Sequence, residues 1–419
     1  MLHVHFSNRI ERLADALAEV LAHPVETEPL CPETIVVGHA GMDEWLKRAL
    51  ATRQGIAANL AFQQPWSFVW RMLRAHDRQL PTSSPLERGP LVWRLYAALT
   101  ATQEKQAPVL ARYLAAGDER APFELAEALA TVFEQYQIYR PEWIRDWEAH
   151  QSATGDAAWQ AALWRQVAGG ATPNPAQLYA DFARHADRLA PGNDLPARVS
   201  VFGISALAPV YLGLLAALAQ TRNVFLFVPN LSREYWGDIE SEARLARWRL
   251  TRPERGDHAT AGAPLLSALG TQSRDFIDLL VGTTSEVESY EHYAPPLGTN
   301  LLARVQTDML NLAPPAPGTV NADDESMQVH VCHSRRREIE VLHDALLACF
   351  EADPALGPEN ILVLAPNMDD YAEPIGAVFG TAPPARYIPW SLTDRSVREE
   401  HPIPEAMLDL LALPESRLK

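Results

Sequence analysis

The segment from Gly38 to Lys47 lies where a nucleotide-binding protein would hold phosphate. It follows an apolar stretch and reads Gly-His-Ala-Gly-Met-Asp-Glu-Trp-Leu-Lys. A phosphate cradle needs a glycine-rich loop, a helix N-terminus and a lysine that holds the phosphates. Here no glycine precedes a lysine, and Asp43 and Glu44 would repel a phosphate at the helix start. The sequence therefore predicts the frame of a nucleotide site without its chemistry.

The second half of such a site would be a buried strand ending in carboxylates, which hold Mg²⁺ and orient water. The best candidate is the apolar stretch Arg198–Phe202, which continues as Gly203-Ile204-Ser205 without an acidic residue. That triplet also lacks the Gly-x-Ser-x-Gly frame of a nucleophile elbow. We therefore expect neither ATP hydrolysis nor nucleophilic catalysis at this strand end.

Metal and nuclease chemistry are also poorly supported. Two histidines lie close together in His3–His5, and two histidines and Cys332 in His330–His333; alternation along a strand would put residues two apart on one face. Structural zinc takes four ligands, and no second Cys/His pair completes either set. Asp43 and Glu44 with Lys47 lack the spacing and the partner acid of a nuclease centre. The sequence predicts no catalytic residue, no metal site and no cofactor, and packing in strands or turns as the role of these residues.

A repeated pattern indicates which elements carry these segments. Residues 32–45 align with residues 358–371, an offset of 326 (358 minus 32), and upstream residues 4–9 align with 331–336. Each copy reads as a strand, a Ser-x-Arg turn, an amphipathic helix, a Pro-Glu loop, an apolar strand and a second helix. That order is typical of a βαβα unit with a parallel strand pair.

The repeat predicts Ile35–Val37 and Ile361–Val363 to be interior parallel strands, because both are apolar throughout. The alternative is that two unrelated βαβ units resemble each other at this level of detail. Met42 and Met368, each followed by aspartate at the same offset, favour duplication.

The order of these patterns predicts an α/β fold in which an all-helical insertion interrupts one lobe. Residues 1–65 and 195–312 would form the first lobe, and residues 66–194 read as helical and hold seven of the eleven tryptophans. A proline-rich stretch at 313–326 reads as a linker, and 327–419 as the start of a second, truncated α/β lobe. Such an insertion matches the lobes of P-loop NTPases and superfamily-one helicases, here without their ATP motifs.

Composition restricts the class of protein and its surroundings. The net charge of −17 is the wrong sign for a surface that coats DNA, so any nucleic-acid contact must be local. Three widely spaced cysteines argue against a disulfide framework and for a reducing cytoplasm. The chain has no leader-like start and no apolar run long enough for a bilayer, so the sequence predicts a cytoplasmic protein without a membrane partner.

Several stretches form one set of motifs in consistent order along nearly the whole chain. They include Gly55–Asn59, Glu134–Trp143, Phe202–Leu207, Tyr235–Ile239 and His330–Ser334. In these motifs the chain resembles the N-terminal part of the RecC family. Those proteins are the gamma subunits of the bacterial helicase–nuclease exodeoxyribonuclease V (RecBCD), and they run to more than twice this length. The resemblance therefore implies an amino-terminal fragment.

The resemblance implies a non-catalytic DNA-binding scaffold that works with RecB-like and RecD-like subunits in recombinational repair of double-strand breaks. In this family the subunit splits the duplex end, handles the unwound 3′ strand and scans that strand for the hotspot Chi. Bases stack on aromatic rings and arginines hold phosphates in single-strand paths. The resemblance assigns DNA binding to Trp70, Glu134, Gln135 and Arg140, which match the family in type.

At other positions that match the family's DNA-contacting residues, this chain has a different side chain. The Chi sequence that it would recognise is therefore left open. These positions are Gly38, Ala40, Glu44, Gln64 and Pro175. Trp70 also has a second interpretation, because it lies in an apolar stretch with Phe68 and Val69 and would serve equally as core.

Two alternative functions remain. One is the related inactive-helicase subunit of a two-component, AddAB-like helicase–nuclease, which an iron–sulfur cysteine cluster near a carboxy-terminal nuclease would favour. The other is an active ATPase with degenerate motifs, against which the missing lysine and strand-end carboxylates count.

Overall fold

The computed structural model describes residues 1–23, 31–101, 108–149, 154–169, 174–188, 195–256, 259–283, 287–314, 317–393 and 402–413. The chain divides into two compact units, Met1–Val320 and Asn321–Lys419.

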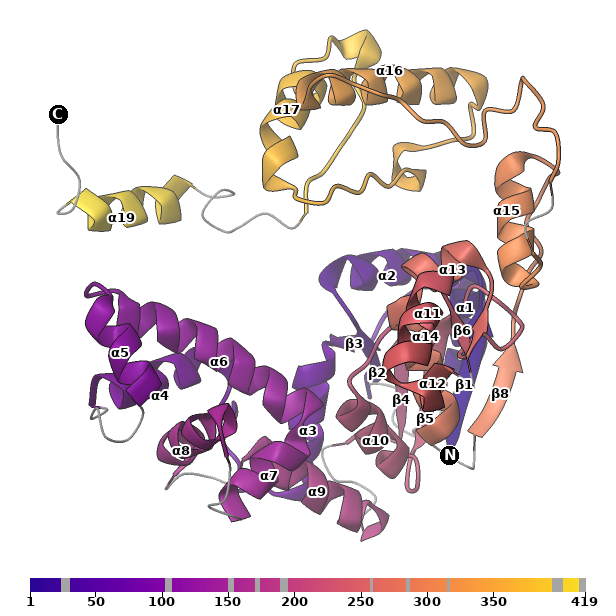
Figure 1. Cartoon of the computed structure of the whole chain (residues 1–419). Helices are drawn as coiled ribbons and strands as arrows, with labels where there is room; N and C mark the ends of the chain where they lie inside the picture. The colour runs from indigo at the N-terminus through magenta and orange to yellow at the C-terminus, as the bar shows by residue number, and fades with distance from the viewer. Residues whose placement is uncertain are drawn as a thin grey trace. The chain divides into compact units, whose positions relative to one another are not determined.

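The first unit is built on a six-stranded sheet whose neighbouring strands are all parallel (Figure 1). Apolar residues fill β2 on both faces, as expected for a strand that helices cover on two sides. The predicted strand at Ile35–Val37 therefore lies in the sheet interior, between β3 and β4. The predicted α/β class is confirmed. In spatial order the strands are β3 (Leu60–Gln63), β2 (Glu33–Val37), β4 (Arg198–Phe202), β5 (Asn223–Pro229), β1 (Leu2–Ser7) and β8 (Val287–Glu291).

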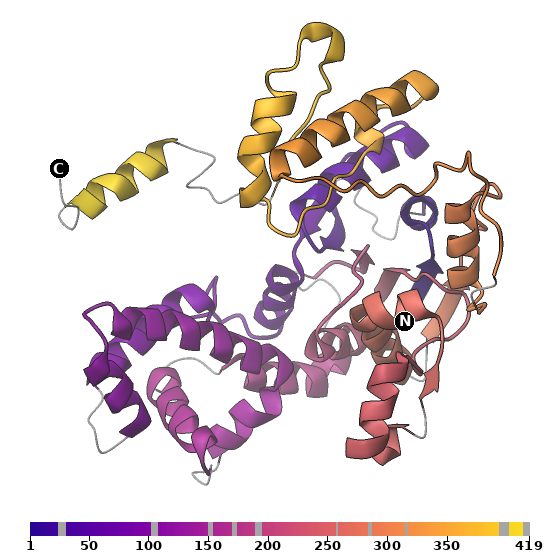
Figure 2. The ribbon, with the colours of Figure 1, turned by 45° about the horizontal axis from the view of Figure 1, so that its top comes forward.

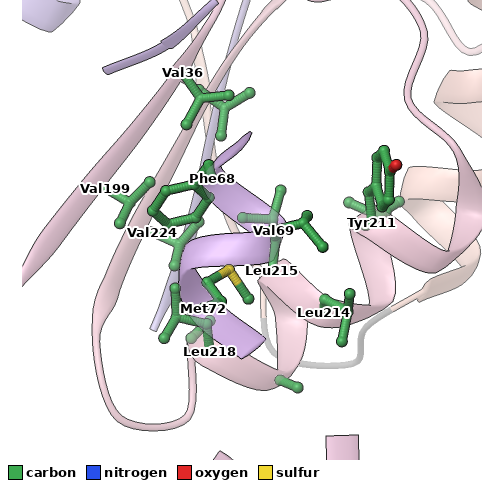
Figure 3. Close-up of a cluster of buried hydrophobic side chains, with 14 of the residues drawn as sticks. Val36, Phe68, Val69, Met72, Val199, Tyr211, Leu214, Leu215, Leu218 and Val224 are labelled. Carbon is green, nitrogen blue, oxygen red and sulfur yellow. The ribbon is translucent and has the colours of Figure 1, made fainter. Parts of the chain in front are cut away.

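Alternation along the strands divides the core into two layers. Val36 points to one face, and Ile35 and Val37 point to the other. The face of Ile35 packs against α1 (Ile10–Leu21) and α2 (Ala40–Gln54). The opposite face packs against four helices, and Figure 3 shows side chains of two of them meeting the valines of the sheet. The four are α3 (Pro65–His76), α9 (Pro175–His185), α10 (Pro209–Leu218) and α14 (Thr271–Thr283).

Between β3 and β4 the only regular elements of the described residues are helices, and five of these, together with Ala176 of α9, share a separate hydrophobic core. Phe133, Trp147 and Trp164 lie at the centre of that core. A fully buried aromatic side chain of this kind contributes about 1.5–3 kcal/mol by leaving water. The five helices are α4 (Arg88–Ala101), α5 (Pro108–Ala116), α6 (Ala121–Tyr139), α7 (Pro141–Ala149) and α8 (Asp156–Ala168).

The remaining strands and α-helices of the first unit are β6 (Ile239–Glu240), α11 (Glu242–Thr251), α12 (Pro253–Gly256), β7 (Thr260–Ala261), α13 (Pro264–Leu269) and α15 (Leu301–Leu310). Of these, β6, α13 and α15 contribute side chains to a small cluster centred on Trp236, whose indole nitrogen donates to Asn230 Oδ1 at 2.9 Å.

In the second unit, α16 (Arg335–Ala352) packs against α17 (Asp369–Phe379) (Figure 2), and α19 (Pro402–Ala412) follows in sequence. The predicted strand at Ile361–Val363 is wrong: the segment is extended but unpaired, and Leu362 is 81% exposed. The predicted strand through His330–His333 is likewise unpaired, and none of the described residues of this unit forms a strand. An apolar pattern gives a strand only where another segment supplies backbone hydrogen bonds.

Histidines cluster where β1 pairs with β8. His5 Nδ1 lies 2.9 Å from His292 Nε2, and the His5 ring stacks on Tyr290 with centroids 4.6 Å apart. His3 Nδ1 lies 3.1 Å from the Glu288 carboxylate. Burial lowers the pKa of His5 to about 4, with help from the neighbouring His292 and His3. The fold therefore favours the neutral form of His5.

We expect the first unit to lose stability as the pH falls from about 6.5, the unfolded histidine pKa. The unfolded chain takes up a proton at His5 before the folded chain does, so stability present above pH 6.5 is lost toward pH 4. Allowing for solvent screening, the loss at pH 5 is about 1–2 kcal/mol. Urea unfolding at pH 7.5 and pH 5 measures it. His5→Gln should have a shallower pH dependence, and an unchanged slope in that variant would contradict the assignment.

Candidate single-strand nucleic-acid interface

The end of α6 and the turn into α7 bring together three of the four predicted site residues. Glu134 and Gln135 lie within the last two turns of α6, and Arg140 follows its last residue. The Arg140 backbone N–H donates to the Tyr136 carbonyl at 2.9 Å, and Pro141 begins α7. Proline suits this position because it has no N–H and its fixed φ fits the first turn of a helix. Gln135 and Arg140 are exposed, and Glu134 is half-buried.

Arg140 lies beside an exposed aromatic ring. Its Nη1 donates to the Tyr139 carbonyl at 2.7 Å, and its guanidinium carbon is 5.7 Å from the centre of the Trp143 ring. Trp143 is 44% exposed, and its inner edge packs against Tyr136 with ring centroids 5.5 Å apart. We call Tyr139, Arg140 and Trp143 the platform. An exposed ring beside a cation is the arrangement that holds a base and its phosphate in single-strand binding proteins.

The exposure of the Trp143 ring was not predicted from the sequence, although a signal was present. In Arg140-Pro141-x-Trp143 the proline starts a new helix, and the tryptophan lies in the first turn of that helix. A tryptophan in the first turn of a surface helix, next to an arginine that ends the previous one, is placed to present its ring to solvent.

Glu134 faces the seam where α6 meets α9 and α10. Burial raises the pKa of the Tyr211 hydroxyl, and the Glu134 carboxylate raises it further. Burial also raises the pKa of Tyr179 well above its ordinary value, with Tyr211 and Glu134 adding to the effect. Both hydroxyls therefore stay neutral. A half-buried carboxylate at such a seam can accept hydrogen bonds from the exocyclic amino group of a base.

Trp70, the fourth predicted residue, lies in the core between the sheet and its helices. Its side chain is 5% exposed, and its indole nitrogen donates to the Pro81 carbonyl at 3.1 Å. The ring stacks with that of Trp66 at 5.7 Å and belongs to the same cluster as Tyr179. This burial favours the packing role that the apolar surroundings of Trp70 suggested. Trp70 is therefore a core residue of the sheet layer and not a member of the platform.

Apolar side chains fill the place where a nucleotide would bind, between the start of α2 and the end of β4. At the start of α2 the His39 imidazole accepts from the Met42 backbone N–H at 3.3 Å. The Met42 side chain reaches the end of β4, where its Cε lies 3.1 Å from the place that a Cβ on Gly203 would take. Gly203 has a φ of +69°, which favours glycine. Lys47 pairs with Asp43 and lies over the ring of Phe62, so it does not point into this space.

Across the ranges that the structure describes, no group of three or more His, Cys, Asp or Glu residues could hold a metal ion. In the same ranges, no helix combines the length and the apolar character needed to cross a membrane.

Comparison with known proteins places the chain in a family. Residues 2–312 match the family model described as RecC, N-terminal domain. The chain belongs to the RecC family. A similar protein is RecBCD enzyme subunit RecC from Escherichia coli (strain K12). The two are 36% identical over an alignment of 470 residues, which covers 100% of this chain and 41% of that protein. The predicted family is thus confirmed.

Two further relatives carry the same name. The Haemophilus influenzae protein is 30% identical over 99% of this chain and 43% of its own length. The Mycobacterium tuberculosis (strain ATCC 25618 / H37Rv) protein is 31% identical over 99% of this chain and 40% of its own length. The chain thus spans about two fifths of the length of the curated relatives it matches.

Proposed function

We propose that this chain is a DNA-binding scaffold of a RecBCD-type helicase–nuclease in the recombinational repair of double-strand breaks. The observation that carries the proposal is the platform, an exposed Trp143 ring beside the Arg140 guanidinium, in a chain of the RecC family. Gln135 and Glu134 lie on the adjoining turns of α6 and offer hydrogen-bonding groups to base edges. The strand handled would be the unwound 3′ strand, scanned for Chi.

The partners in this proposal are RecB-like and RecD-like subunits and a duplex end. The relatives are named subunits of the RecBCD enzyme, and that name supports the first two. In the proposed organisation, residues 1–65 and 195–312 are a helicase-like lobe and 66–194 its helical insertion. A linker at 313–326 would lead to a second lobe that begins at 327. The net charge of −17 leaves most of the surface unsuited to DNA and free for proteins.

The proposed scaffold does not use ATP. The carboxyl ends of β2 and β4 are occupied by apolar side chains, and Lys47 is engaged by Asp43. Titration calorimetry with Mg-ATP should therefore give no heat of binding. A micromolar site with one ATP per chain would instead favour an active ATPase with degenerate motifs.

Strand binding tests the proposal directly. We expect the chain to bind a labelled single strand more tightly than a duplex of equal length, because stacking needs unpaired bases. The affinity should fall steeply with salt, with a logarithmic slope of about −0.7 per phosphate contacted. Fluorescence anisotropy between 25 and about 200 mM salt would measure both properties. A preference for duplex, or no binding at the lowest salt, would contradict the proposed function.

A further inference from the structure

Helix α3 has two sides of opposite character. Phe68, Val69 and Met72 of its inner side pack against the sheet and α10 (Figure 3). The other side carries Arg71 and Arg74, and Arg78 follows just after the helix ends at His76. These three arginines, which we call the arginine row, line a surface depression together with Ala75. Arg74 and Arg78 are exposed, and Arg71 is half-buried.

The arginine row concentrates positive charge in an acidic protein. Three guanidinium groups fall within eight residues of a chain whose net charge is −17. Among the residues that the structure describes, no carboxylate oxygen lies within 4 Å of the side-chain nitrogens of Arg74 or Arg78. Exposed arginines elsewhere, such as Arg48 and Arg184, do pair with carboxylates. The row is therefore a local cationic site of the kind that the overall charge requires for any contact with a polyanion.

We infer that the arginine row binds the phosphate backbone of a nucleic-acid strand, as a contact separate from the platform. This inference rests on the proposed function and adds a second binding site to it. Arg71 and Arg74 are three residues apart, which is about 4.5 Å at the helical rise, and Arg78 follows two residues after the helix ends. Phosphates along one B-form strand follow at about 3.4 Å each along the axis, so Arg71 and Arg74 match neighbouring phosphates and Arg78 is placed for a further one. The described residues that line the depression include no aromatic ring, so the row contacts phosphates and does not read bases.

The geometry of arginine suits this role. A guanidinium presents a planar fork of donors that matches two phosphate oxygens, and it stays charged at any physiological pH. The spacing of 71 and 74 puts these two side chains next to each other on one helix face, and Arg78 lies in the turn just beyond the helix. Like charges at that spacing repel one another, and a bound polyanion relieves the repulsion.

The test compares two double variants of the 419-residue chain that change its charge equally. Arg74→Gln with Arg78→Gln removes two members of the row. Arg247→Gln with Arg249→Gln removes two exposed arginines of α11, which also lack a carboxylate within 4 Å among the described residues. The probes are a labelled oligo-dT strand and an abasic deoxyribose-phosphate strand of the same length. Melting temperatures confirm that each variant is folded.

We expect the row variant to bind both probes roughly tenfold more weakly at low salt, with a salt slope smaller by about 1.4, and the α11 variant to bind nearly as the parent does. Equal weakening by both variants would overturn the inference, because it would report overall charge alone. An unchanged strand affinity with a lower affinity for polyglutamate would also overturn it, by assigning the row to an acidic protein segment.

The failure of this inference can be distinguished from failure of the proposed function. If Trp143→Ala weakens oligo-dT binding and the row variant does not, the function stands and the row has no part in it. If the unsubstituted chain binds neither probe, the proposed function itself fails, and the arginine row fails as its extension.

Discussion

Replacing Trp70 by alanine is expected to destabilise the first unit by about 3–5 kcal/mol, the usual cost of truncating a buried aromatic residue. The side chain is 5% exposed and packs in the main core, so its removal leaves a cavity that the sheet and helices only partly fill. The Pro81 carbonyl would also lose its donor. Urea unfolding followed by circular dichroism, at constant pH and salt, measures the change.

Trp143→Ala is the matched control, because it removes the same side chain from a position that is 44% exposed. It should change the melting temperature much less than Trp70→Ala does. Trp70→Phe should recover most of the stability by filling the cavity. If Trp70→Ala kept the parent melting temperature and lost strand affinity, Trp70 would be a base contact, and the core would have to open for it.

The interior of the sheet could be predicted from the sequence because its signals are local. Ile35–Val37 is a short apolar run and Val199, Val201 and Phe202 supply the apolar residues of Arg198–Phe202; turn residues bound both segments, and helices follow both. Such a run forms a strand wherever its neighbours are supplied, and β2 has β3 and β4 on its two sides. Ile361–Val363 carries the same pattern but has no neighbouring strand among the described residues. Pairing depends on segments distant in sequence, so the pattern alone could not distinguish the two cases.

The candidate site was predicted in part for a similar reason. Gln135 and Arg140 lie on one helix end, so their proximity follows from local geometry. Trp70 is buried in a core that also takes side chains from α9 and α10, among them Tyr179 and Tyr211, more than 100 residues further along the chain. No local pattern distinguishes a tryptophan that stacks on a base from one that packs beneath two distant helices. The exposure of Trp143 did have a local sign, the proline two residues before it.

The second large effect is expected at the platform. Trp143→Ala should weaken single-strand binding by about 1–3 kcal/mol, the range measured when one stacking ring is removed. That range corresponds to a roughly fivefold to 150-fold rise in the dissociation constant. The loss should be nearly the same for every base, because each base has a face to stack. Anisotropy with labelled homopolymers of equal length measures the change, and Trp143→Phe should restore part of the affinity.

Arg140→Ala distinguishes the platform from a ring that is merely exposed. Among the residues that the structure describes, the Arg140 side chain makes only a local hydrogen bond to the Tyr139 carbonyl and the contact with the Trp143 ring, so its loss should leave the melting temperature nearly unchanged. A phosphate contact predicts weaker binding and a salt slope smaller by about 0.7. With both substitutions present, the combined loss should differ from the sum of the single losses, because the cation and the ring touch. Strictly additive effects would mean that the two side chains meet the strand independently, and full affinity in both single variants would remove the platform from the proposed function.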